Sequence, residues 1–114
     1  MRKSDRIRLQ HMLDAAREAM SFVQGKTRKH LERDRILVLA LVKAIEIIGE
    51  AAYQIPPQTR SRTPEIPWED IIGMRYRLVH GYFDIDLDIL WSTVQKDLPQ
   101  LTAILESVLK KGEA

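Results

Sequence analysis

The chain has 114 residues, of which 45% are hydrophobic, and this length suits one compact domain without room for a second. It contains no cysteine, which excludes thiolate nucleophiles, disulfide frameworks and thiolate zinc sites and is typical of a reducing compartment. The formal net charge of +2 and a sequence pI of about 9.0 permit a nucleic-acid partner without requiring one.

The sequence carries no sign of a membrane protein. Its first ten residues, MRKSDRIRLQ, are charged where a signal peptide needs an apolar stretch. The longest apolar run, from Ile36 to Ile48, is interrupted by Lys43 and Glu46, whereas a membrane span needs about 20 consecutive apolar residues. We therefore expect a cytoplasmic protein that has no contact with a membrane.

The first periodic segment predicts a helix that begins near Asp5, with Ser4 as its N-cap, and ends at Gly25. One stripe of this helix is apolar and contains Ile7, Leu13, Ala16, Met20 and Val23. A glycine after the last turn favours a left-handed C-terminal stop. The basic segment that follows is predicted to be a connector and contains Lys26, Arg28, Lys29 and His30.

The second helix is expected from Asp34 to Tyr53 and is apolar almost all round. Its apolar side chains include Ile36, Leu37, Leu41, Ala44, Ile45, Ile48 and Ala52. A small bundle buries few positions on every side. Such a helix is therefore either the central core helix or lends part of its surface to a subunit interface, and the sequence leaves both interpretations open.

Proline interrupts the chain after this helix. Four of the five prolines lie between Ile55 and Pro67, so this segment is predicted to be the longest loop, either a connector or a mobile flap. A helix is expected to resume at Pro67, with Glu69 and Asp70 near its positive end, and to stop at Gly81.

The C-terminal third predicts further helix. Apolar residues recur at helical spacing from Leu87 to Val94, and the pattern from Leu98 to Val108 continues this helix or begins another near Pro99. Alternating apolar and polar stretches bounded by turns are absent from the sequence, so no strand is predicted. The expected fold class is all-α, an up-and-down bundle of four to five helices in which residues 1–114 form a single domain.

Titratable groups gather in the segment MRYRLVHGYFDID, residues 74–86. Arg75 and Tyr82 are seven residues apart and return to nearly the same face of a helix with about 3.6 residues per turn. Arg75 and His80 are five apart and do not share a face. They converge if the helix unwinds near Gly81, if the arginine reaches round, or if a second subunit supplies an equivalent segment. This mismatch favours a composite site in a homodimer.

The same residues also have purely structural interpretations. Arg75 could form an ion pair with Glu46 or Glu50 across helices. His80, just before a glycine, could interact with the dipole at a helix C-terminus. A structural ion pair and a functional role need not exclude each other.

The tryptophans and the later acids favour structural roles. Trp68 and Trp91 lie beside apolar residues at helical spacing, which indicates core or interface anchors rather than stacking platforms. Asp84, Asp86 and Asp88 resemble part of a calcium loop, but no glycine turn or terminal glutamate follows at the required positions. We interpret these acids as surface or partner-facing residues and predict no metal site.

Arg75, four intervening residues, His80, Gly81 and Tyr82 together resemble the Arg-x4-His-x-Tyr motif of the HepT-like toxins of the HEPN superfamily. The similarity covers residues 34–101. It includes the helix ending in IIGEAA, the proline-rich loop, the segment PWEDIIGMR and the acidic segment DIDLDILW after the histidine.

This resemblance implies a HEPN-like helical fold and a metal-independent endoribonuclease without a cofactor, in which two subunits bring two motifs into one cleft. Arg75 would pair with phosphate oxygens and His80 would transfer protons. The resemblance also casts Tyr82 as the residue to which a minimal nucleotidyltransferase antitoxin, of the MntA type, transfers AMP. That modification would neutralise the toxin in a type VII toxin–antitoxin system.

We expect Arg77 and the connector cations to hold the RNA backbone, the latter being Lys26, Arg28 and Lys29. Tyr76 departs from the pattern, because the family commonly has Asn or Asp after the motif arginine. Two other functions therefore stay open. One is a non-catalytic adaptor that binds nucleotide or RNA for a nucleotidyltransferase, and the other is a helical protein that serves only to dimerise.

Overall fold

The computed structural model describes residues 1–81 and 84–112, and most of these residues are helical. Within them, four long helical segments form the bundle. These are α1 (Lys3–Phe22), α3 (Arg35–Tyr53), α5 (Trp68–Leu78) and a C-terminal run of α6 (Leu87–Ser92), η1 (Thr93–Asp97) and α7 (Leu98–Gly112). The expected all-α bundle is confirmed, and the homodimer stays a prediction.

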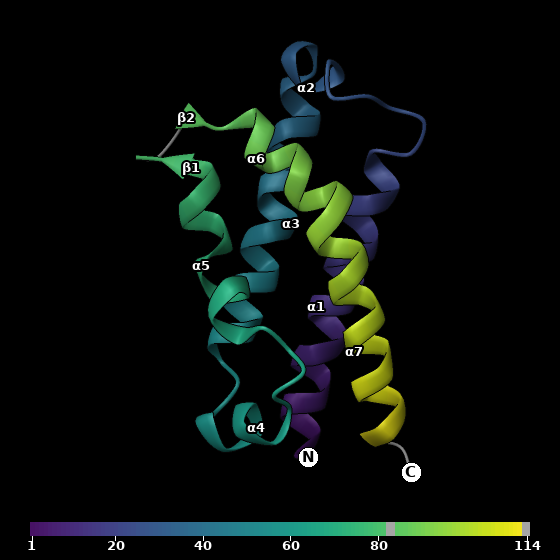
Figure 1. Ribbon diagram of the computed structural model, residues 1–114, viewed down its shortest axis with the longest axis vertical. Coiled ribbons are helices and arrows are strands. Elements are labelled where there is room, and N and C mark those ends of the chain that lie inside the picture. Colours follow the sequence, from purple (N-terminus) through teal and green to yellow (C-terminus); the bar gives the residue numbers. More distant parts are fainter. Residues whose placement is uncertain (82–83, 113–114) are drawn as a thin grey trace.

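Short elements occupy the connections between the long helices. They are α2 (His30–Arg33), α4 (Pro57–Arg62) and an antiparallel hairpin of β1 (Val79–His80) and β2 (Asp84–Ile85). Figure 1 shows the hairpin and α2 at one end of the elongated molecule, and α4 with the start of α1 and the end of α7 at the other. In the described part of the chain, no helix combines the length and the apolarity that crossing a bilayer requires.

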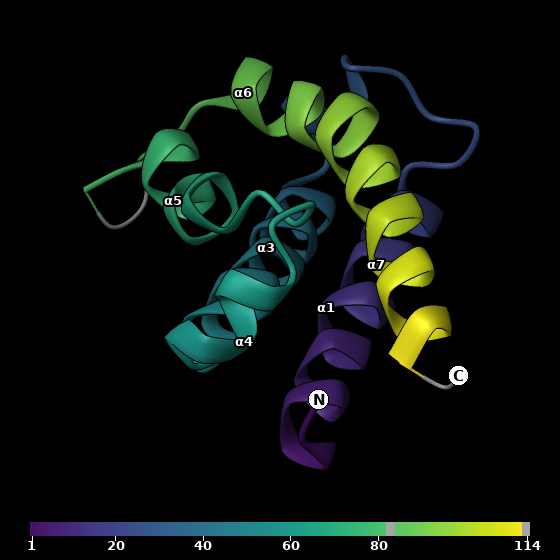
Figure 2. The same cartoon turned by 60° about the horizontal axis from the view of Figure 1, so that its bottom comes forward.

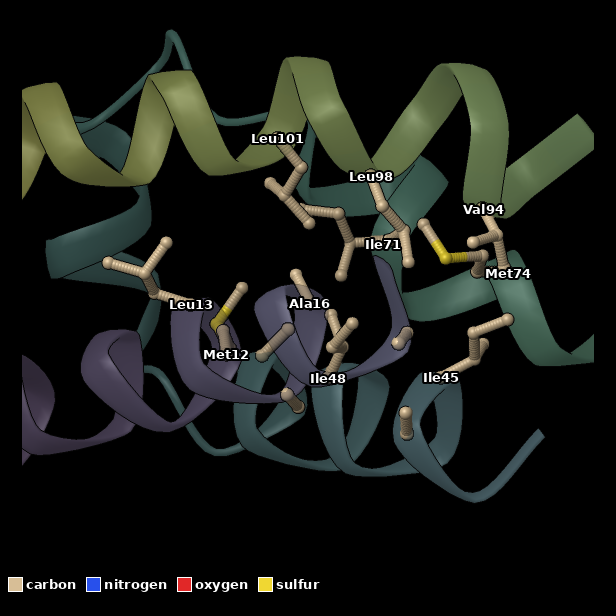
Figure 3. Packing of buried hydrophobic residues seen from close by; sticks show 14 of the residues in the cluster. Met12, Leu13, Ala16, Ile45, Ile48, Ile71, Met74, Val94, Leu98 and Leu101 are labelled. Atoms are coloured by element: carbon tan, nitrogen blue, oxygen red, sulfur yellow. The ribbon is translucent and has the colours of Figure 1, made fainter. Parts of the chain in front are cut away.

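Helix α3 is the central helix of the bundle. It packs against α1, α5 and α6, and Leu41, Ile45 and Ile48 on it are fully buried. Figure 2 shows α3 between α5 and α1, and Figure 3 shows its side chains meeting those of α1, α5 and α7 in one cluster. Ile36 is nevertheless 81% exposed and Leu39 50% exposed. The central-helix interpretation is therefore confirmed, and α3 also keeps an uncovered apolar surface near its N-terminus.

The start of α1 differs from the prediction that Ser4 is its N-cap. The helix begins at Lys3, after an extended Arg2, and no side chain caps it. Asp5 in the first turn is fully buried, and its Oδ2 accepts a hydrogen bond of 2.6 Å from Oγ1 of Thr59 in α4. The acid near the positive helix end thus joins α1 to α4, while Ser4 is exposed.

Two other predicted helix boundaries are confirmed. Gly25 has a φ of +72° after the end of α1, which is the left-handed conformation that glycine adopts without steric cost. Asp34 caps α3, because its Oδ1 accepts a hydrogen bond of 3.0 Å from the backbone N–H of Leu37.

The proline-rich segment is not the long loop that the sequence predicts, because α4 lies inside it. Pro57 occupies the first turn of α4, where its missing N–H is not needed and its fixed φ suits a helix. The segment is also anchored to the core. Ile66 is buried, and Nε1 of the buried Trp68 donates a hydrogen bond of 3.2 Å to the carbonyl of Thr63. These contacts favour the connector interpretation and confirm the core role of Trp68.

Helix α5 ends earlier than predicted, at Leu78 rather than Gly81. Val79 and His80 adopt extended backbone and pair with Ile85 and Asp84, so the prediction that the chain has no strand is wrong. Gly81 follows β1 with a φ of +72°, which suits a tight reversal. Two-residue strands are too short to produce the alternating pattern by which strands are read from sequence.

The C-terminal run continues through Pro99 as the sequence allows, with one wide turn. Residues 93–97 form a π-helical turn, η1, just before the proline. Because proline has no N–H, the carbonyl of Gln95 cannot receive the usual bond from residue 99, and a wider turn accommodates this loss. Trp91 in α6 is partly buried and packs against the core, which confirms its structural role.

Candidate active site

Arg75 lies on α5 and is held by an acid of the central helix. Its Nε donates a hydrogen bond of 2.9 Å to Oε1 of Glu46 in α3, and the two side chains are 42% and 35% exposed. Of the two partners that the sequence offered, Glu46 therefore forms the ion pair. Within residues 1–81 and 84–112, the two terminal nitrogens of Arg75 make no hydrogen bond, so they can contact an anion without breaking this pair.

His80 lies on β1 and not at the end of a helix. Its side chain is exposed, and its backbone pairs with Asp84 on the neighbouring strand. The helix ends at Leu78, two residues earlier, so the interpretation of His80 as a helix C-terminal residue is wrong. An exposed imidazole on a hairpin at the end of the bundle can reach a molecule outside its own chain.

The prediction that Arg75 and Tyr82 lie on the same face of one continuous helix is wrong. A shared helical face needs an unbroken helix over seven residues, whereas α5 ends at Leu78 and is followed by β1. Tyr82 itself lies outside the described residues. Its expected modification stays a prediction.

The predicted RNA-binding cations have different environments. Lys26 and Lys29 are exposed between α1 and α2. Arg77 is exposed on α5, and its Nη2 donates a hydrogen bond of 3.1 Å to the carbonyl of Asp70 in the first turn of the same helix. These three side chains have the exposure that contact with a phosphate backbone needs.

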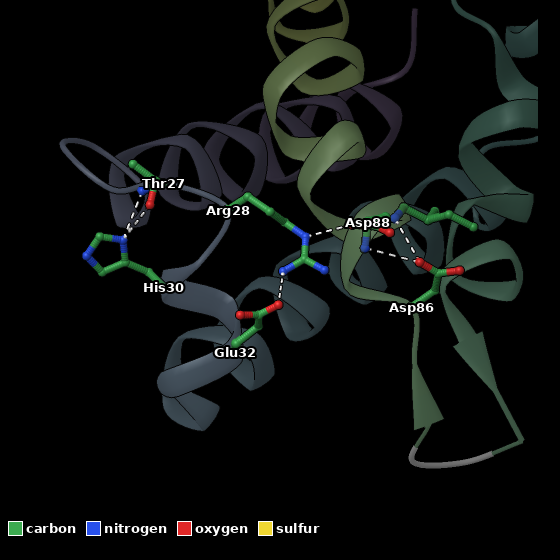
Figure 4. A network of polar contacts seen from close by, with 7 residues as sticks. Thr27, Arg28, His30, Glu32, Asp86 and Asp88 are labelled. Carbon is green, nitrogen blue, oxygen red and sulfur yellow. Dashed lines mark hydrogen bonds and ion pairs between the residues drawn. The ribbon is translucent and has the colours of Figure 1, made fainter.

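Arg28 differs because it already has acidic partners. Its Nε lies 2.8 Å from Oδ1 of Asp88, and its Nη1 lies 3.5 Å from Oε1 of Glu32 (Figure 4). Asp86 caps α6 by accepting hydrogen bonds of 3.1 Å from the backbone N–H groups of Asp88 and Ile89. The network links the segment between α1 and α2 to the start of α6, which follows the hairpin that carries His80.

A groove lies beside Arg75 and is bounded by α1, α3 and α5. Its volume is about 850 Å³. Its titratable and aromatic lining comes from Arg8 and His11 on α1, Lys43, Glu46, Glu50 and Tyr53 on α3, and Arg75 and Tyr76 on α5. Among the described residues His80 is not part of this lining, so one chain presents its motif arginine on the groove and its motif histidine beyond it.

Five of these groove residues were not predicted from the sequence to bind a ligand. They are Arg8, His11, Lys43, Tyr53 and Tyr76. A signal for those on α3 was present. Lys43, Glu46, Glu50 and Tyr53 follow one another at intervals of three or four, which places polar side chains along one line of an otherwise apolar helix. For the residues on α1, only the packing of α1 against α3 reveals the groove.

Comparison with known proteins assigns the chain to a family. Residues 12–108 match the sequence model of the family described as ribonuclease HepT-like, which is most of the chain. The chain therefore belongs to the HepT-like ribonuclease family.

Curated relatives support the same assignment. A protein of Caldanaerobacter subterraneus that is provisionally named an RNase is 34% identical over 109 residues, which are 96% of this chain and 97% of the relative. A protein of Thermococcus cleftensis named a probable ribonuclease HepT is 36% identical, over 86% of this chain and 93% of its own. No solved structure matches the chain.

The turn at Gly81 generates a stability prediction. Gly81→Ala should lower the free energy of unfolding by roughly 1 kcal/mol, because a Cβ strains a backbone whose φ is +72°. Gly73→Ala is the matched control. It lies inside α5, where the new Cβ would meet only the flexible end of Arg77 at 3.6 Å, so it should raise this free energy by about 0.5–1 kcal/mol. Urea unfolding followed by circular dichroism measures both changes, and an unchanged Gly81→Ala protein would refute the turn geometry.

Proposed function

We propose that the protein is a metal-independent endoribonuclease toxin of a type VII (HepT/MntA) toxin–antitoxin system, active in the cytoplasm as a homodimer. The observation that carries the proposal is the accessibility of both motif side chains in a chain of the HepT-like ribonuclease family. His80 is exposed, and Arg75 is 42% exposed with its terminal nitrogens available to an anion. These exposures do not support the alternative that the two side chains are part of the buried core.

The chemistry of the two side chains suits RNA cleavage. In cleavage without a metal, a base removes the proton of the 2′-hydroxyl, the 2′-oxygen attacks the phosphorus, and the departing 5′-oxygen receives a proton. His80 transfers protons in this scheme, because an imidazole ring can both accept and donate a proton. Arg75 balances the charge that grows on the phosphate, and its bond to Glu46 orients the guanidinium without occupying the terminal nitrogens.

A second subunit would complete the site. One chain places Arg75 on the groove and His80 on the hairpin beyond it, so a pocket that holds both needs a partner or a movement of the hairpin. The exposed Ile36 and Leu39 near the start of α3 supply apolar surface that a second copy can cover. Helix α3 begins at the end of the molecule that carries the hairpin, as Figure 1 shows.

The substrate is RNA, held by its backbone outside the reacting position. Arg77, Lys26 and Lys29 are exposed cations suited to this contact. Arg28 acts in the same way only if the RNA phosphate displaces the carboxylates of Asp88 and Glu32. We therefore expect Arg28 to contribute less to RNA affinity than either lysine.

The catalytic proposal predicts the loss of activity in two single variants. His80→Ala and Arg75→Ala should each lower the rate of RNA cleavage by at least about 100-fold in a buffer with EDTA, because one removes the proton-transfer group and the other the phosphate-binding cation. Gel analysis of labelled RNA measures the rate, and circular dichroism verifies the fold. His30→Ala is a matched control, since His30 is an exposed histidine on α2. Cleavage by His80→Ala at the wild-type rate would reject the assignment.

The regulatory proposal concerns Tyr82 and a nucleotidyltransferase partner of the MntA type. Transfer of AMP to this tyrosine would add negative charge one residue beyond the His80–Gly81 pair and repel an RNA phosphate. After co-expression with such an enzyme, intact-mass and peptide mass spectrometry should show AMP on Tyr82, and cleavage should stop. Tyr82→Phe should stay active and unmodified. AMP only on Tyr53 or Tyr76 would contradict this proposal.

A second candidate function is a non-catalytic adaptor that binds nucleotide or RNA for a nucleotidyltransferase complex. Tyr76 favours it, because the residue beside the motif arginine is an aromatic side chain that is 75% exposed. Binding of RNA by the wild-type protein without any cleavage would support this candidate against the ribonuclease.

A further inference from the structure

We infer that the groove between α1, α3 and α5 is a binding site for single-stranded RNA, in which Tyr76 and Tyr53 stack on nucleobases and Lys43 and Arg8 contact phosphates. The inference rests on the proposed ribonuclease function and adds to it the site for the nucleotides that flank the cleaved bond. Arg8, Lys43 and Tyr53 lie outside the Arg-x4-His-x-Tyr motif, and Tyr76 occupies the first of its four unspecified positions.

The position of the groove connects it with the chemistry. Arg75 lines one of its walls, so a strand that gives a phosphate to this arginine continues directly into the groove. Lys43 and Glu46, one turn apart on α3, also line it, and Glu46 holds the arginine. A volume of about 850 Å³ is within the range of pockets that hold ligands larger than a single base.

The tyrosines suit bases because most of each side chain is exposed. Tyr76 is 75% exposed and Tyr53 is 65% exposed, although aromatic side chains of this size are usually covered. Neither hydroxyl forms a hydrogen bond with any described residue. An exposed aromatic ring beside cations is the usual arrangement for single-stranded nucleic acid, because every base has a face that can stack.

The charges of the groove favour an anionic strand. Three permanent cations, Arg8, Lys43 and Arg75, line it against two acids, Glu46 and Glu50. Arg75 is paired with Glu46, and Arg8 lies 3.7 Å from Oδ1 of the buried Asp5, so both of these cations already have an acidic partner. Lys43 forms no ion pair within residues 1–81 and 84–112. Glu50 remains as the repulsive group, so we place the phosphates toward Lys43 and Arg8 and the bases toward the tyrosines.

The test measures binding separately from cleavage. The probe is a fluorescein-labelled 2′-O-methyl oligonucleotide of about 12 nucleotides, a length within the site sizes of single-strand binders, which cannot be cut by any mechanism that uses the 2′-hydroxyl. Fluorescence anisotropy gives the dissociation constant for wild-type protein and variants over a series of salt concentrations. Cleavage of ordinary RNA is assayed in parallel with the same proteins.

Tyr76→Ala should weaken binding about tenfold, because loss of one stacked base costs roughly this factor, whereas Tyr76→Phe should bind within about twofold of wild type. Lys43→Ala should weaken binding and reduce the slope of log affinity against log salt by about 0.7, the value for one phosphate of a single strand. The matched controls are Phe22→Ala and Lys96→Ala, which remove an exposed aromatic and an exposed lysine outside the groove and should leave binding unchanged.

The outcomes separate the two proposals. If Tyr76→Ala and Lys43→Ala bind the probe as wild type does while wild-type protein cleaves RNA, the groove inference is overturned and the ribonuclease stands. If binding depends on the groove but no RNA is cleaved, the ribonuclease fails and the groove stands. If light scattering instead shows that Tyr76→Ala turns a dimer into a monomer whose affinity for the probe, per subunit, is unchanged, the groove is a subunit interface. This result would also overturn the inference.

Discussion

The end of α5 at Leu78 is the constraint on which the rest of the site depends. Three residues before this end, Arg75 is fixed against α3 by Glu46, and two residues after it, His80 stands on an extended strand. Had the helix run on to Gly81, the histidine would have continued to wind round the bundle surface. The hairpin instead carries an exposed imidazole to the end of the molecule, which can face another subunit.

The central helix α3 links the stability of the fold to the geometry of the site. One of its faces contributes Leu41 and Ile48 to the core, and another carries Glu46, which holds the guanidinium of Arg75. Both partners of this ion pair are partly exposed, so the bond adds little to stability. Its consequence is positional. A guanidinium with one nitrogen fixed and two nitrogens available meets a phosphate with less loss of side-chain entropy than an unrestrained arginine.

The sequence predicts the parts of this structure that repeat at helical spacing. The long helices, the start of the second helix at Asp34 and the left-handed glycine at residue 25 follow from apolar periodicity and local chemistry, which act over short distances. The sequence predicts the ion pair of Arg75 only as one of two alternatives, because it does not determine how far α3 and α5 are shifted along each other. Glu46 and Glu50 are one turn apart, and packing decides between them.

The features that the sequence could not give arise from contacts distant along the chain. Asp5 is buried by its bond to Thr59, 54 positions away, and so it differs from the exposed acid that a first helical turn leads one to expect. The hairpin is similar, because two-residue strands carry no periodic signal and form through pairing across Gly81. The groove appears only when α1 and α5 flank α3. Tyr76 departs from the family pattern and Tyr53 lies on the polar line of α3, but neither feature of the sequence locates a groove.

The central claim is that Arg75 of one subunit and His80 of another act in one pocket, and mixing inactive subunits tests it most directly. Arg75→Ala and His80→Ala chains, unfolded together in equal amounts and refolded, form heterodimers in which one of the two composite sites is intact. The mixture should recover about a quarter of wild-type ribonuclease activity, since about half of the dimers are mixed and each has one working site. Each variant refolded alone should stay inactive. A mixture as inactive as its components, with subunit exchange verified by mass, would contradict the composite site.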